Sequence, residues 1–167
     1  MRVRRVQTIM SRATESQKRP EDDLLGSICS DIAHNLPDAL VDMEQVTSIF
    51  RIERGNSMNT VLIHELGRFN VLLSQILTTL ADLDGAQKGE ILMTERLSTT
   101  RLQLLQGYVP DSWLAVSYPT MKPLASYVRN LNLRIKTLQK WVDDEEPPEV
   151  FWLPGFFFTN SFLTAIL

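Results

Sequence analysis

The 167-residue sequence predicts a mainly α-helical protein, an irregular bundle built round two long antiparallel helices with a proline-rich connection. Apolar residues recur at alternating steps of four and three in residues 57–84 and again in residues 123–142, which is the spacing of one helix face. Pro110, Pro119 and Pro123 interrupt the stretch before the second helix. A composition of 44% apolar and 22% charged residues is typical of a globular domain, and the length fits one domain.

The N-terminal part begins with a basic stretch. We expect residues 1–21 to form a basic, poorly ordered segment with a solvated charged surface, and a tail for RNA or membranes and a mitochondrial import signal are the alternatives. Residues 22–36 have apolar side chains at helical spacing, and Pro37 ends that predicted helix. Residues 37–56 fit either a helix or a strand.

Residues 57–84 form the clearest predicted element. Asn56 or Ser57 is suited to cap its first turn, and Gly85, then Gly89, is suited to end it. We expect its seam to be buried inside the protein's own bundle, although a dimeric coiled coil uses the same spacing. The seam residues are Leu62, Leu66, Phe69, Leu73, Ile76, Leu80 and Leu83.

A shorter helix is predicted over residues 94–106, with Thr94 as its cap and Gly107 at its end. The helix over residues 123–142 follows the proline-rich connection, and an acidic run at residues 143–149 marks its exit. We expect the seams of the two long helices to bury one another. The second seam consists of Leu124, Val128, Leu131, Ile135, Leu138 and Val142.

The C-terminal residues 150–167 are the most apolar stretch, with six Phe and Trp residues between positions 151 and 162. We expect an extended piece at residues 150–153, a turn at Pro154–Gly155 and then a new helix. A membrane anchor is not expected, because a span needs roughly 20 predominantly apolar residues and this stretch is interrupted. The aromatic residues are typical of core positions, and we expect their covering layer to lie beyond Leu167.

The sequence offers no motif for catalysis. His64-Glu65 begins a zinc-protease pattern, but Arg68 stands where the second histidine belongs. Cys29 is the only cysteine, residues 85–90 lack the spacing of a phosphate-binding loop, and the net charge is −3. We therefore expect no catalytic, nucleotide-binding or metal-binding residue, no cofactor, and neither nucleic acid nor membrane as a partner. The residues by themselves indicate a helical packing or interaction module.

Four longer phrases are more specific: "SMNTVLIHELGRFNVLL" (57–73), "VPDSW" (109–113), "SYPTMKPLASYVRNLNLRIKTLQKW" (117–141) and "FWLPGFFFTNSFLTA" (151–165). In this order and spacing they resemble the C-terminal region of dynein heavy chains, closest to the axonemal ones. The resemblance implies that residues 22–56 correspond to the end of the helical part of the last AAA+ module. It implies that residues 57–167 form an incomplete C-terminal domain, truncated before a β-rich tail.

The resemblance also implies a function. The family is the ATP-driven microtubule motor of cilia and flagella, and this region braces its AAA+ ring without containing the ATP, Mg²⁺ or microtubule sites. The implied partners are the ring of the same heavy chain and other dynein subunits, in the cytoskeleton of the axoneme. A free-standing helical interaction adaptor is the alternative. The motif positions expected to pack are Ser57, Met58, Asn59, Phe69, Asn70, Pro110, Trp113, Tyr118, Pro119, Lys122, Pro123, Trp141, Phe151, Trp152, Gly155, Phe156, Phe157 and Phe158.

Overall fold

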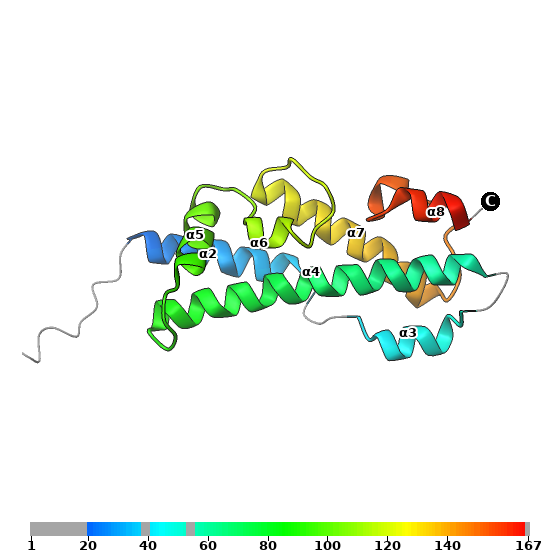
Figure 1. Ribbon diagram of the computed structural model, residues 1–167, viewed down its shortest axis with the longest axis horizontal. Coiled ribbons are helices and arrows are strands. Elements are labelled where there is room, and N and C mark those ends of the chain that lie inside the picture. Colours follow the sequence, from blue (N-terminus) through cyan, green and yellow to red (C-terminus); the bar gives the residue numbers. More distant parts are fainter. Residues whose placement is uncertain (1–19, 38–40, 53–55, 166–167) are drawn as a thin grey trace, which may run out of the picture.

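A computed structural model describes residues 20–37, 41–52 and 56–165 of the protein. This described part contains seven α-helices, one short 3-10 helix and no strand (Figure 1), which confirms the mainly α prediction. The basic segment predicted at residues 1–21 lies almost wholly outside the described residues. The elements are α2 (Pro20–Asn35), α3 (Met43–Ile49), α4 (Ser57–Lys88), α5 (Glu95–Leu105), α6 (Asp111–Leu114), α7 (Leu124–Asp144), η1 (Leu153–Gly155) and α8 (Thr159–Ala165).

Helix α4 runs along most of the long axis of the molecule, and the other helices pack around it (Figure 1). All seven predicted seam residues are buried. The helix passes through Gly85, where we expected a first stop, and ends at Gly89 with a positive φ of 76°. The amides of Gly89 and Glu90 donate to the carbonyls of Ala86 and Gly85, which satisfies the last turn. Gly85 stays helical and buried, and a Cβ there would lie 3.4 Å from Ile91, which folds back over it.

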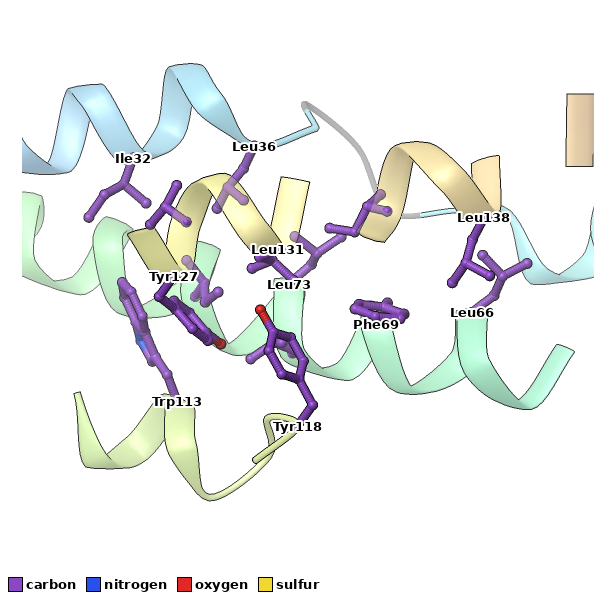
Figure 2. Close-up of a cluster of buried hydrophobic side chains, with 14 of the residues drawn as sticks. Ile32, Leu36, Leu66, Phe69, Leu73, Trp113, Tyr118, Tyr127, Leu131 and Leu138 are labelled. Atoms are coloured by element: carbon purple, nitrogen blue, oxygen red, sulfur yellow. The ribbon is translucent and has the colours of Figure 1, made fainter. Parts of the chain in front are cut away.

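Helix α7 runs antiparallel to α4, and its six predicted seam residues are buried as well. The two seams do not face only each other, because α2 packs against both helices. Ile32 of α2 and Leu36, directly after it, belong to the shared core (Figure 2). A second line of α7, Tyr127, Arg134 and Trp141, is also buried. Helix α7 is therefore covered on a wider face than its seam predicts.

The proline-rich connection contains the short helix α6, which begins directly after Pro110 and buries Trp113. The preceding helix α5 begins as predicted, since the Thr94 hydroxyl accepts the Leu97 amide at 3.2 Å. It ends at Leu105, and Gly107, two residues further on, has a positive φ of 77°. Pro110 and Pro123 directly precede α6 and α7, where their missing amide costs no helical hydrogen bond.

Residues 43–49, within the stretch that the sequence left open, form helix α3. The Asp42 carboxylate caps it by accepting the amides of Glu44 at 2.9 Å and Gln45 at 3.2 Å. Val46 and Phe50 are buried toward the core. The side chain of Asn56, predicted as a cap of the long helix, makes no capping hydrogen bond.

The C-terminal residues 151–165, here called the tail segment, pack back onto the bundle (Figure 1). The expectation that their aromatic residues lack a cover within the protein is wrong for Phe156 and Phe162, which are buried. Turn η1 reverses the path of the backbone, so that α8 lies against α4. The predicted helix is present, but the piece at 150–153 forms no strand and Leu153 already belongs to η1.

Candidate functional site

A buried carboxylate from α4 binds the backbone of the tail segment. Glu65 is 2% exposed, and its oxygens accept the amide of Phe157 at 2.6 Å and the amide of Phe158 at 3.2 Å. Helix α4 positions this side chain beside the seam residues Leu62 and Leu66, so Glu65 faces the core rather than water. Two amides of an irregular segment thus gain a charged acceptor.

A buried cation from α7 binds the carbonyl side of the same peptide group whose amide, that of Phe157, Glu65 accepts. Arg134 is 9% exposed, and its Nη1 donates to the Phe156 carbonyl at 3.3 Å while its Nε donates to Asn130 Oδ1 at 2.9 Å. Its guanidinium carbon lies 3.7 Å from the ring centroid of Tyr118 and 5.7 Å from that of Trp152. Such cation–π contacts are strongest where water is excluded.

Glu65 and Arg134 together hold three consecutive residues, Phe156 to Phe158, between α4 and α7, and we call this arrangement the tail clamp. Burial raises the pKa of the Glu65 carboxyl above its ordinary value, while the two amide donors and the charges of Arg68 and Arg134 oppose that rise. The contacts go to main-chain atoms, so the clamp fixes the path of the tail segment. The clamp therefore consists of two charged side chains that bind backbone groups of the same protein.

Aromatic rings surround the clamp. Phe157 packs edge-on against Phe69, with ring centroids 4.6 Å apart, and against Tyr118 at 5.6 Å. Tyr118 also stacks on Tyr127 at 5.7 Å. Tyr127 and Ser117 share a hydrogen bond of 2.8 Å, and burial raises the pKa of Tyr127 to about 12. The Tyr118 hydroxyl, in contrast, is buried with no hydrogen-bond partner among the described residues.

A second ring cluster packs the two ends of the tail segment together. Phe151 lies 5.4 Å from Trp141 of α7 and 4.7 Å from Phe162 of α8, measured between ring centroids. Phe156 lies 4.9 Å from the same Phe162 ring. Gly155 is needed next to this cluster, because a Cβ there would lie 2.7 Å from the Trp152 ring.

Two asparagines of the "SMNTVLIHELGRFNVLL" phrase join α4 to the link before it. The Asn70 side chain pairs with both backbone groups of Val41, accepting its amide at 3.0 Å and donating to its carbonyl at 2.7 Å. Asn59 donates to the Arg51 carbonyl at 3.0 Å. These bonds span 29 and 8 residues of sequence, so they fix tertiary structure.

The remaining motif positions are spread over the surface and the core. Pro110 is buried before α6, and Met58 is half-buried at the start of α4. Phe158 is 49% exposed, and the Arg68 guanidinium lies over its ring at 3.9 Å. The positions that are exposed and lie outside the core are Ser57, Pro119, Lys122 and Pro123.

The two charged residues of the clamp were missed by the sequence reasoning, which singled out Glu65 only as part of a zinc pattern. A signal was present for Arg134, since it stands seven residues from both Tyr127 and Trp141 on a line beside the seam. Glu65 likewise follows Val61 by four residues and precedes Leu72 by seven. A charge in line with apolar residues indicates a buried and paired group.

Two other kinds of site are absent from the described residues. No three His, Cys, Asp or Glu side chains of that part gather where they could hold a metal ion. None of its helices is both long and apolar enough to span a bilayer. His64, the start of the zinc pattern, is exposed on α4.

The fold and the clamp define a helical packing module that holds its own C-terminal segment. Residues 2–167 match the model of a protein family, the C-terminal domain of the dynein heavy chain. The protein therefore belongs to the family of C-terminal domains of dynein heavy chains.

Individual relatives agree with this assignment. Dynein axonemal heavy chain 3 of Homo sapiens is 40% identical over 159 residues, which cover 95% of this sequence and 4% of that protein. Dynein axonemal heavy chain 12 of Homo sapiens is 42% identical over 146 residues, 87% of this sequence and 5% of that protein. Dynein axonemal heavy chain 1 of Mus musculus is 38% identical over 146 residues, 87% of this sequence and 3% of that protein. The aligned residues thus span 5% or less of the length of these relatives.

Proposed function

We propose that this protein acts as a non-catalytic structural and regulatory segment of an axonemal dynein heavy chain, in microtubule-based movement of cilia or flagella. The observation that carries the proposal is the use of the two buried charges. Glu65 and Arg134 bind main-chain groups of the tail segment, so they brace the domain. The likeness to axonemal heavy chains supplies the motor context.

The proposed partners are the AAA+ ring of the same heavy chain and other dynein subunits. Microtubules would be reached through other parts of the motor, and ATP and Mg²⁺ would bind there too. A segment that braces a ring needs a stiff body, and α4, α7 and the clamped tail segment form one continuous core. We propose no cofactor, nucleic acid or membrane for this segment.

Recovery of the protein from isolated axonemes tests this function. An affinity tag is placed on the endogenous protein, and particles are extracted with salt and separated by sedimentation. We expect this sequence to travel with heavy-chain AAA+ sequences and axonemal dynein subunits. Recovery in complexes that lack heavy-chain sequences would instead support the free-standing adaptor and overturn the proposal.

A second measurement addresses catalysis directly. The 167-residue protein is titrated with ATP in the presence and absence of Mg²⁺, and binding and phosphate release are followed. We expect neither, since phosphoryl transfer depends on a phosphate-binding loop and a residue that holds the metal, and the sequence has no such loop. Saturable, Mg²⁺-dependent binding would contradict a non-catalytic role.

A further inference from the structure

A groove of about 720 Å³ opens on the side of α4 that faces away from the α7 seam. Its floor is α4, and its walls come from α3, from the residues after α6 and from the tail segment. It is distinct from the tail clamp, although Phe157 and Phe158 belong to both. The lining includes Ile63, His64, Gly67, Arg68 and Val71 of α4 and Phe158 of the tail segment.

The groove is mostly apolar and partly open to water. Val71 on its floor is 58% exposed and Phe158 on its wall is 49% exposed. Apolar surface of this kind, hollowed and rimmed by polar groups, is typical of a site that receives another polypeptide. The tail segment packs on the bundle without fully covering Val71 or the ring of Phe158, so both remain partly exposed within the described part of the protein.

Gly67 lies in the middle of this floor, and the fold itself does not require a glycine there. A Cβ at Gly67 would meet no atom within 4 Å, whereas one at Gly155 would clash with Trp152 at 2.7 Å. Glycine makes a helix interior less stable than alanine does, and no contact within the described residues requires the smaller residue at this position. At the floor of a groove it provides the space that lets a partner's side group approach the α4 backbone.

The basic side chains in the groove favour a partner that carries a carboxylate. Its lining contains Arg68 and His64 and no carboxylate. Arg68 forms no ion pair among the described residues, and it rests on the Phe158 ring. Glu65, which does interact electrostatically with Arg68, is buried and occupied by the amides of the tail segment. A carboxylate on the partner would therefore find a guanidinium that has no ion pair among the described residues, at the edge of an apolar surface.

The length of the floor indicates the form of the partner. Residues 63–71 span two turns of α4, roughly 12 Å at 1.5 Å per residue. Two side chains of a partner helix that lie one turn apart would both fit within this length. We propose that the groove binds an amphipathic helix of another polypeptide, which places a bulky apolar side chain over Gly67 and a carboxylate against Arg68. This inference concerns a different surface from the tail clamp and stands independently of the proposed dynein role.

A pair of designed helical peptides tests the proposal on the full 167-residue protein. Both peptides have about 18 residues, enough for a helix, with leucines along one face. One peptide has glutamates beside the leucines and the other has lysines. Fluorescence anisotropy measures binding, and amide chemical shifts locate it. We expect saturable binding of the glutamate peptide with shifts at residues 63–71, and binding of the lysine peptide at least about tenfold weaker.

Two variants and two matched controls locate the contact. Gly67→Leu fills the groove, and Arg68→Glu reverses its charge. We expect each to weaken the glutamate peptide about tenfold or more. Gly26→Leu is the control for the first, since a Cβ at this α2 glycine also meets nothing within 4 Å. Leu133→Glu, on an exposed α7 position outside the groove lining, is the control for an added carboxylate. Both controls should bind as the unsubstituted protein does, and circular dichroism should show that all four variants keep their helicity.

Three results would overturn the proposal: equal binding of both peptides, shifts outside the groove, or binding that Gly67→Leu leaves unchanged. Self-association of the protein that Gly67→Leu abolishes, measured by sedimentation without peptide, would assign the groove to a second copy instead. The proposed function fails separately, through the absence of heavy-chain sequences from the axonemal particles. The two failures are therefore distinguishable.

Discussion

The two halves of α4 are held in different ways. The half that ends at Lys88 packs mainly through aliphatic residues such as Leu80 and Leu83 against its neighbours and ends in a glycine cap. Its bond to the backbone of another segment, from Gln87 to the Asp22 carbonyl at 3.1 Å, lies at the exposed surface. The half that begins at Ser57 adds directional polar contacts to its apolar seam, from Asn59, Glu65 and Asn70 to backbone groups of other segments. The first kind of packing follows from spacing along the helix, whereas the second depends on where remote segments come to lie.

This difference predicts two kinds of failure. Loss of an aliphatic side chain leaves a cavity in a core shared by several helices, so the whole bundle should lose stability. Loss of a polar contact should release one segment while the rest of the bundle remains folded. Substitutions in the two halves should therefore differ in how far their effects spread through the bundle.

The largest effect is expected for Leu83→Ala, which truncates a fully buried side chain of the aliphatic half. We expect the free energy of unfolding to fall by about 2–5 kcal/mol. Chemical denaturation followed by circular dichroism measures it, with protection lost throughout the helices. Leu92→Ala, at a residue that is 83% exposed, is the control and should change stability by less than about 0.5 kcal/mol.

Glu65→Gln should come next, with a cost of about 1–3 kcal/mol. Glutamine offers one acceptor oxygen and turns its NH₂ group toward the second amide, so one of the two amides loses its partner. Amide hydrogen exchange should accelerate at Phe157 and Phe158 and stay unchanged in α5. Glu146→Gln, at an exposed carboxylate, is the control. Uniform acceleration in α5 as well would show that the clamp belongs to the global core.

Asn70→Ala removes both bonds to Val41 and should cost about 1–2 kcal/mol, since the backbone groups of Val41 are only partly buried and water can replace the amide. Exchange should rise at Val41 and in α3 and stay slow in α7. Asn132→Ala on α7, with an asparagine that is also partly buried, is the matched control. An unchanged α3 would mean that Val46 and Phe50 hold this helix without the asparagine.

Two tyrosines of the aromatic cluster should respond differently to the loss of a hydroxyl. Tyr127→Phe leaves the Ser117 hydroxyl without its partner and should cost about 1 kcal/mol. Tyr118→Phe removes a buried hydroxyl that has no partner among the described residues, and it keeps the ring that lies against Arg134. Its cost should be close to zero. A larger loss for Tyr118→Phe, in thermal unfolding of both variants, would reveal a bond to that hydroxyl.

The smallest effect concerns pH. Burial raises the pKa of Glu65 above its ordinary value near 4.5, so the folded protein binds this proton more tightly than the unfolded protein does. Between the ordinary and the raised value, the contribution of Glu65 to the free energy of unfolding therefore falls as the pH rises. Urea unfolding from about pH 4 to pH 7 should show the advantage over Glu65→Gln shrinking with rising pH. A growing advantage would mean that Arg134 and the two amides outweigh burial.

The two long helices, their seams, most of their ends and the family could be predicted from local patterns in the sequence. These follow from interactions within a few residues, namely apolar spacing, the Thr94 cap and glycines that accept a positive φ. The four phrases that carry the family likeness are contiguous, so they could be recognised without a fold.

Three features depend on long-range packing and could not be predicted: the burial of Glu65 and Arg134, the helix α3 packed on α4, and the burial of Phe156 and Phe162 by the protein itself. The Glu65 contacts join residues that are 92 and 93 positions apart. Helix spacing shows which side chains share a face, but a buried charge also needs a partner of the right geometry. That partner is a set of backbone groups, and every sequence offers the same backbone groups at every residue except proline, so their position is decided only when the protein has folded.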